Sequence, residues 1–321
     1  MSGVQHRGVP LVSFIWVAAL TAGLVAGCQR TIQTTIAGAP TKTQMAELWV
    51  PADASRDLFW GPGGKRLAPD PLARYTVIEV KRGGFSRGYT VLDAQKREWS
   101  VKFPPEAPTE VAASRLMWGL GYHQPPVYYL AEWQAEKATS PNPQLPARFR
   151  ERSPDLSGLD TDATWSYYRN PFIGTPQMNG LLVLQAMLGN SDLKDAQNAL
   201  YTLKEPVHGA RRWYVARDVG QTFGRTGLID PPRGNVEVFE KSGFIKGVEN
   251  GFVQFDYSGR HKSLFERIRP SDVRWICERV AALTDQQLQD AFRAAGYPKP
   301  TADRFIRRLQ QKAAEGLRLK D

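Results

Sequence analysis

The stretch "RYTVIEVKRGGFSRGYTVLDAQKREWSVKF", residues 74–103, predicts three consecutive β-strands. Aromatic and β-branched residues recur along it, and a glycine-rich turn and the polar turn "DAQKRE" (93–98) separate the strands. Prolines follow directly, and Thr109-Glu110 then begins a predicted helix over 110–121. The stretch therefore indicates a β-rich unit that leads into a helix.

The flanking sequence extends this into two lobes. A short strand at 125–134 completes a β-rich N-terminal lobe (49–135), and a proline-rich, charged connector is expected over 136–165. Helices dominate the C-terminal lobe (166–321). They include the apolar "PQMNGLLVLQAMLGN" and three amphipathic C-terminal helices, with strands at 198–203 and 212–217 and a hairpin turning at Asn250-Gly251. This order predicts an α+β fold with two lobes.

Length, composition and charge agree with a globular protein. The chain has 321 residues, 42% of them hydrophobic, with 9 tryptophans and a net charge of +10. Such a charge suits an anionic membrane or a phosphorylated ligand. The basic residues are not interleaved with aromatics on one platform, so nucleic acid is not expected as a partner.

The N-terminus indicates export. Arg7 precedes an apolar run that ends in Val25-Ala26-Gly27-Cys28, and this resembles the lipobox of bacterial lipoproteins. The resemblance implies a signal peptide over 1–27, a lipid (palmitate) on Cys28, a flexible tether over 28–48 and an extracytoplasmic, membrane-anchored protein, with inner or outer membrane left open. An uncut signal anchor is the alternative, but the run is shorter than the ~20 residues that span a bilayer.

Candidate ligand-binding residues lie in the β-rich lobe. Gly84 and Gly88 permit close backbone approach, and Ser86 could donate to a phosphate oxygen, although an ordinary hairpin turn reads the same way. Lys102 stands between apolar residues on its strand, and Glu110 shares a helix face with packing residues. An inward carboxylate needs a cation, so the two are expected to pair; two exposed charges are the alternative.

A second polar group follows in the helical lobe. Asp192 could orient or deprotonate a hydroxyl, Lys194 could neutralise charge on a phosphoryl group, and Asn198 and Asp218 could bind Mg²⁺. A helix cap with an Asx turn and a strand-ending aspartate are the structural alternatives.

Together these segments resemble atypical protein-kinase-like families. "LGNSDLKDAQNALYTL" (188–203) and "WYVARDVGQTFGR" (213–225) are similar to the catalytic and metal-binding segments of secretory-pathway kinases, type II phosphatidylinositol 4-kinases and HipA-type kinases. The resemblance implies a kinase-like fold that uses ATP and Mg²⁺. It implies Lys102 on the phosphates and paired with Glu110, Asp192 as catalytic carboxylate, and Asn198 and Asp218 as metal ligands.

The chain departs from the family pattern in two places. Asn198 lies further beyond Asp192 than is usual, which leaves Gln197 or Asp195 as alternative ligands, and the Asp218 segment reads "RDVGQTFG".

Two functions are carried forward from the sequence. One is membrane-anchored, ATP/Mg-dependent phosphotransfer to an unknown protein, lipid or small-molecule acceptor. The alternative is a pseudokinase-type binding or scaffold lipoprotein without catalysis. The source of nucleotide outside the cytoplasm is an open question for the first. Zinc chemistry is disfavoured, because the chain has four histidines and no His-x-x-x-His.

Overall fold

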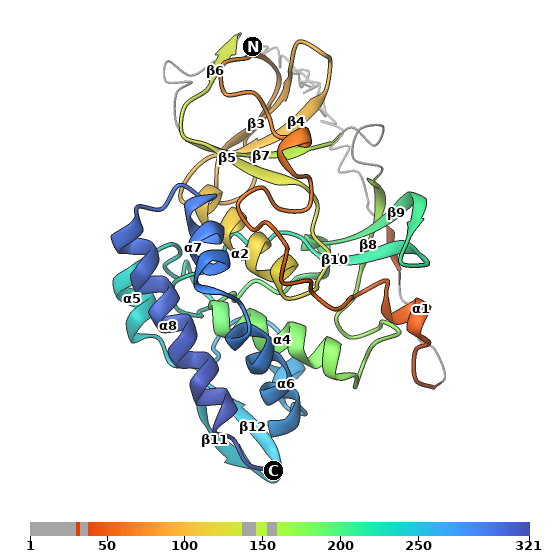
Figure 1. Cartoon of the computed structure of the whole chain (residues 1–321), viewed down its shortest axis with the longest axis vertical. Coiled ribbons are helices and arrows are strands. Elements are labelled where there is room, and N and C mark those ends of the chain that lie inside the picture. The colour runs from red at the N-terminus through yellow and green to blue at the C-terminus, as the bar shows by residue number, and fades with distance from the viewer. Residues whose placement is uncertain (1–29, 33–37, 137–145, 153–158) are drawn as a thin grey trace, which may run out of the picture.

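The computed structural model describes residues 30–32, 38–136, 146–152 and 159–321. A β-sheet lobe lies above a lobe built mainly of helices, and a smaller sheet lies beside their junction (Figure 1). The α+β class with a β-rich N-terminal lobe and a mainly helical C-terminal lobe is therefore confirmed.

The upper lobe is a six-stranded sheet in the order β5-β7-β4-β3-β2-β6. The three strands predicted over 74–103 are present as an antiparallel meander. The strand bounds are β2 Arg74–Lys81, β3 Gly88–Leu92, β4 Glu98–Lys102, β5 Val127–Leu130, β6 Gln134–Glu136 and β7 Ala147–Glu151.

Strand alternation divides the residues of this sheet between two faces. Val91 and Trp99 are fully buried in an aromatic core with Phe149. Their neighbours along the strands, such as Ser100 and Lys102, therefore project from the opposite face. That opposite face is the one that carries the polar side chains of the cavity described below.

Strand β7 corrects the expected connector. Residues 136–165 were predicted as a loop, but β7 is an interior strand between β4 and β5, and strand β8 (Leu159–Trp165) follows. Charged residues alternate with Ala147 and Phe149 in β7, which is why it reads as polar. The described part of the connector is thus largely sheet.

Helix α2 (Glu106–Gly119) begins four residues before the predicted start. Pro108 lies in its first turn, where no intrahelical N–H bond is lost, so the proline does not end the helix. All but two of its 14 residues are buried. The helix packs against β5 and β7 above and against α7 of the lower lobe.

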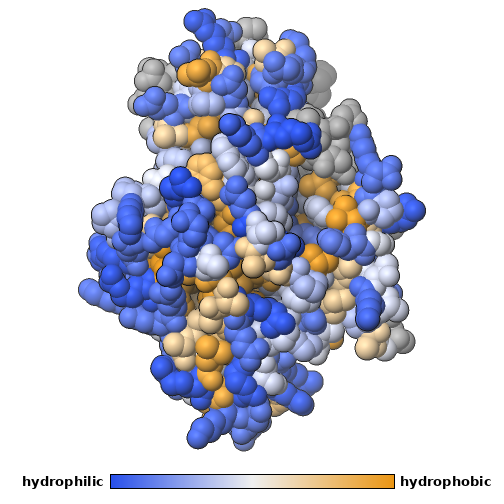
Figure 2. Space-filling view, viewed as in Figure 1, coloured by the Kyte–Doolittle hydropathy of each residue, from blue (hydrophilic) through white to orange (hydrophobic). Residues whose placement is uncertain are grey.

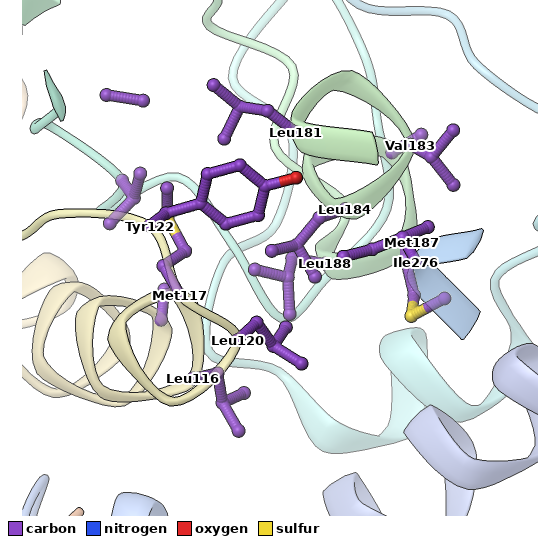
Figure 3. Close-up of a cluster of buried hydrophobic side chains, with 14 of the residues drawn as sticks. Leu116, Met117, Leu120, Tyr122, Leu181, Val183, Leu184, Met187, Leu188 and Ile276 are labelled. Atoms are coloured by element: carbon purple, nitrogen blue, oxygen red, sulfur yellow. The ribbon is translucent and has the colours of Figure 1, made fainter. Parts of the chain in front are cut away.

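The lower lobe surrounds a large hydrophobic core. Leu116 and Met117 of α2, and Leu120 directly after this helix, belong to this core together with Leu184 and Leu188 of α4 (Figure 3). The helices of the lobe are α4 Pro176–Leu188, α5 Val236–Lys241, α6 Pro270–Ala281, α7 Asp285–Arg293 and α8 Lys299–Leu317. The three predicted C-terminal helices are therefore confirmed.

The strands of the lower lobe form two sheets. β1 (Arg30–Ile32), β8, β9 (Asn198–Val207) and β10 (Ala210–Ala216) make one sheet in that order. β11 (Ile245–Glu249) and β12 (Phe252–Phe255) make the predicted hairpin. Its turn residues, Asn250 and Gly251, both have positive φ, as a tight two-residue hairpin turn requires.

The expected tether is partly a folded segment. Helix α1 (Lys42–Met45) precedes Leu48, which is fully buried, and the Glu47 carboxylate lies 3.2 Å from Arg212. Apolar side chains every second residue around Leu48 explain why this part joins the domain. The predicted signal peptide, residues 1–27, and Cys28 lie outside the described residues.

Among the described helices, none combines the length and apolar character needed to cross a bilayer. Figure 2 shows that hydrophilic residues cover most of the face in view, with hydrophobic residues gathered in smaller groups.

Candidate active site

A cavity of about 660 Å³ lies between the two lobes. It brings together seven residues singled out from the sequence, which come from the glycine-rich turn, strand β4 and the segments on either side of the β9–β10 hairpin. These are Gly84, Ser86, Gly88, Lys102, Asp192, Lys194 and Asp218. Lys102 and Asp218 are 116 residues apart in the chain.

Lys102 is the centre of the site. Its ammonium lies 2.7 Å from Asp218 Oδ1, 2.9 Å from Glu110 Oε2 and 3.4 Å from Glu106 Oε2. Burial alone would lower the pKa of Lys102, but the attraction of Glu110 and Asp218 outweighs it and raises that pKa. The predicted Lys102–Glu110 pair is therefore present, and Lys102 is held in its charged form.

Glu110 is buried among cations from two strands. Arg148 Nε lies 2.9 Å from Glu110 Oε1, and Arg150 Nη1 lies 3.4 Å from the same oxygen. Burial would raise the pKa of Glu110, but Arg148 and Lys102 lower it below its ordinary value. Burial opposes ionisation of Asp218 in the same way, and Lys102 lowers its pKa. Both carboxylates are thus ionised at neutral pH.

The glycine-rich turn covers one side of the cavity. Gly84 has φ +90°, and a Cβ on Gly88 would stand 2.2 Å from the Val101 carbonyl oxygen, so β3 can approach β4 there only with glycine. The Ser86 hydroxyl is buried and has no hydrogen-bond partner among the described residues. It is therefore available to donate to a ligand.

The tip of this turn contacts the lower lobe. The Arg233 guanidinium lies 3.4 Å from the centre of the Phe85 ring, and Arg233 also lies 2.5 Å from Glu106 Oε1. A cation over an aromatic face is attractive, so Phe85 holds the tip against the opposite wall of the cavity.

Asp192 faces the cavity and is held by three donors. Lys194 Nζ and Gln197 Nε2 lie 3.0 and 2.6 Å from Asp192 Oδ2, and Arg260 Nε lies 3.3 Å from Oδ1. The Asp192 N–H donates to Asn190 Oδ1, so the expected Asx turn is present as well. A structural turn and a carboxylate in the cavity coexist in this segment.

The structure corrects the expected amide ligand. Asn198 is buried outside the cavity, and its Nδ2 donates to the Trp165 carbonyl. Gln197 lines the cavity instead, and its Oε1 is buried without a hydrogen-bond partner among the described residues. Asp195, the other alternative, accepts from the Tyr167 N–H. Asn198 starts strand β9, and alternation therefore turns it away from Gln197.

The cavity oxygens fit a hard divalent cation. Mg²⁺ prefers carboxylate and amide oxygens, and here Asp218, Gln197 Oε1 and Asp192 Oδ1 all belong to residues that line the cavity. Gln197 Oε1 is buried without a hydrogen-bond partner in the described structure, and the buried Asp192 Oδ1 has an ion-pair contact with Arg260 there. No cluster of three or more His, Cys, Asp or Glu suited to a metal occurs in the described ranges.

Several residues of the cavity were not predicted. Glu106 lies one helical turn before Glu110, and this i, i+4 spacing was the available signal. The arginines of β7 alternate with apolar residues, which also indicates a strand with one apolar and one polar face. The other charged residues that line the cavity and were not predicted are Lys81, Arg87, Asp230, Arg233 and Arg260.

Comparison with known proteins gives a limited result. No family model matches the sequence, and no curated protein matches it significantly. Structural matches include the Golgi casein kinase with Mn/ADP bound (12% identity, TM-score 0.43, 78% of this chain and 74% of that one) and the Helicobacter pylori proinflammatory kinase CtkA (10%, 0.42, 76% and 94%).

Both of these solved structures are described as kinases. Each TM-score is below 0.5, so neither likeness carries an argument about this chain.

Proposed function

We propose that this protein is a phosphotransferase that takes a nucleoside triphosphate with Mg²⁺ and transfers its terminal phosphoryl group to a hydroxyl acceptor. The observation that carries the proposal is the position of Lys102, held between Glu110 and Asp218 in a cavity that also contains Asp192. Phosphoryl transfer depends mainly on positioning and charge stabilisation, and these residues supply both.

The binding half of the site lies under the glycine-rich turn. Its backbone and the unpartnered Ser86 hydroxyl would donate to phosphate oxygens, and the Lys102 ammonium would neutralise their charge. Glu110 keeps Lys102 in place from the side away from the ligand, because it is itself fixed by Arg148. The cation is thus positioned before the ligand binds.

The transfer half of the site is the Asp192 segment. An acceptor hydroxyl oxygen would form the new P–O bond while the bridging P–O bond breaks and leaves its electron pair on the departing diphosphate. Asp192 would orient the hydroxyl and take its proton, and Lys194, 3.0 Å from Asp192, would stabilise charge on the transferred group. Mg²⁺ held by Asp218, Gln197 and Asp192 would neutralise phosphate charge.

One observation favours the alternative, a binding protein without catalysis. Lys194, Gln197 and Arg260 all contact the Asp192 carboxylate, so this carboxylate already has partners within the protein. A pseudokinase would retain ligand binding through Lys102 and leave Asp192 as a structural turn residue.

Thermal unfolding with and without millimolar MgATP tests the binding step. A ligand at about 100 times its dissociation constant stabilises a protein by about 2.7 kcal/mol, which is readily measured. We expect stabilisation of the wild type, its loss in Lys102→Met and Asp218→Asn, and its retention in Lys246→Met, a matched control on the exposed Lys246–Asp256 pair. An unshifted wild type would overturn the proposal.

Labelled phosphate tests the transfer step. With γ-labelled ATP, we expect transfer to protein or water in the wild type and its loss in Asp192→Asn, while the thermal shift remains. Full transfer in Asp192→Asn would reject its catalytic role. Binding without any transfer in the wild type would establish the pseudokinase alternative.

We further propose that the protein is anchored by lipid on Cys28 at the outer side of a membrane. The small residues before Cys28 support this. Metabolic labelling with a radioactive fatty acid should mark the wild type and not Cys28→Ser. Label that persists in Cys28→Ser would reject the anchor.

A further inference from the structure

The inner wall of the cavity is unusually basic. Four of its residues lie on three strands of the upper sheet: Lys81 on β2, Ser100 on β4, and Arg148 and Arg150 on β7. Lys81 is paired with Gly88, Gly88 with Lys102, Lys102 with Arg148, and Ser100 with Arg150. This register places all four polar side chains on the face that carries Lys102.

The cations of this wall outnumber their partners. The Ser100 hydroxyl accepts from Lys81 Nζ at 3.0 Å, and Arg148 Nη1 lies 3.4 Å from the same oxygen. Arg148 and Arg150 also share Glu110, which already serves Lys102. No ion pair joins Lys81 to a carboxylate in the described structure. Among the described residues, the hydrogen-bond partner of Lys81 is therefore a neutral hydroxyl, beside two arginines.

The same imbalance extends over the whole cavity. Eight lysine and arginine residues line it, against four carboxylates, among the residues that the structure describes. Burial, then the charges of Arg152, Arg150 and Arg148, lower the pKa of Lys81 to about 8, and Glu79 opposes them. An anion placed beside Lys81 would relieve this repulsion.

Apolar surface lies elsewhere in the cavity. Phe85 and Leu228 are 55% and 65% exposed, so they border the opening, and Pro231 lines the same cavity. A purine ring binds best between apolar or aromatic side chains, and the wall around Lys81 and Ser100 offers charged and hydroxyl groups instead. The inner wall suits an anion better than a nucleobase.

We infer that Lys81, Ser100 and Arg150 form a binding site for an anionic group of the phosphate class, in the same cavity as Lys102. The preferred ligand is then an oligophosphate with charged groups at both Lys102 and the inner wall. This inference deepens the proposed function, because it names the ligand class of the same cavity. The oligophosphate can be the phosphate chain of a nucleotide or a chain without a base.

Calorimetric titration of the full chain with three probes distinguishes a nucleotide from a phosphate chain without a base. MgATP, tripolyphosphate and adenosine are each titrated into the wild type, Lys81→Met, Arg150→Gln and the control Lys246→Met. Lys81→Met leaves no carboxylate without its cation, so we expect it to fold. We expect tripolyphosphate to bind, to weaken at least tenfold in Lys81→Met and Arg150→Gln, and to be unchanged in the control. Adenosine should not bind.

The pH dependence of tripolyphosphate binding gives a second test, because a variant that merely loses structure would not reproduce it. Lys81 is charged below about pH 8, so tripolyphosphate should bind more weakly as the pH rises through that value. The difference in tripolyphosphate affinity between the wild type and Lys81→Met should become smaller over the same pH range. If this difference in affinity does not change with pH, Lys81 is not part of the anion-binding site.

The remaining outcomes distinguish this inference from the proposed function. MgATP binding that Lys81→Met leaves intact, with no tripolyphosphate binding, overturns the inference and leaves the proposed function standing. Tripolyphosphate binding that Lys81→Met weakens, without MgATP binding, supports the inference and overturns the proposed function.

Discussion

Replacing Glu110 by glutamine tests the buried charge network on which the site depends. Glu110 is ionised, fully buried, and within 3.4 Å of Lys102, Arg148 and Arg150. Glutamine keeps the shape and removes the charge, so three cations are left to share a neutral side chain. Loss of one partner from a buried ion pair costs about 3–5 kcal/mol, and we expect Glu110→Gln to fall in that range.

Thermal unfolding followed by circular dichroism measures this cost. One kcal/mol corresponds to about 2 °C for a chain of this size, so the midpoint should fall by about 6–10 °C. The matched control is Glu136→Gln, since Glu136 pairs with Arg74 at the exposed surface and such pairs contribute about 0–1 kcal/mol. A Glu110→Gln variant within 1 kcal/mol of the wild type would refute the reasoning.

The pH dependence of the same variant gives an independent check. The folded pKa of Glu110 is lowered, so its contribution to stability is present above the unfolded pKa of about 4.3 and is lost as the pH falls through the folded value. The stability difference between wild type and Glu110→Gln should therefore be constant near neutral pH and shrink below about pH 4.

Three further predictions concern other parts of the molecule. Gly88→Ala should destabilise by about 1–3 kcal/mol in urea unfolding, because its Cβ would meet the Val101 carbonyl, whereas Gly83→Ala, which meets nothing within 4 Å, should be near neutral. Burial lowers the pKa of Lys312 to about 7, so stability should rise by about 2 kcal/mol between pH 7 and 9, and Lys312→Met should abolish that rise. Burial raises the pKa of the Cys277 thiol to about 12, so peptide mapping should find it unalkylated by iodoacetamide at pH 8 until the protein unfolds.

Much of the fold was predictable because its elements are locally encoded. The meander over 74–103 alternates apolar and polar residues between clear turns, and the hairpin at Asn250-Gly251 has the residues its turn requires. Strand β7 was missed because its arginines read as a surface. Their carboxylate partner, Glu110, is about 40 residues away in the chain, so only the folded sheet shows that they point inward.

The candidate site was predictable where side-chain chemistry alone suggested a partner. Lys102 and Glu110 were paired correctly, since an inward carboxylate needs a cation. The choice between Gln197 and Asn198 depended on where strand β9 begins, because alternation along a strand sends neighbours to opposite faces. Element boundaries are set by tertiary hydrogen bonds, such as that from the Asp218 N–H to the Gln197 carbonyl.

The burial of α2 determines how a ligand can enter. The helix carries Glu106 and Glu110 and packs against both β7 above and α7 below, so it joins the two halves of the molecule rigidly. Rotating it outward would expose hydrophobic side chains that are now buried. Phe85 of the 83–88 turn borders the opening of the cavity and contacts Arg233 of the lower lobe, so a ligand that enters past this turn would separate one ring from one guanidinium. Moving this turn therefore breaks one contact between the lobes, whereas moving α2 would separate it from β5, β7 and α7 together.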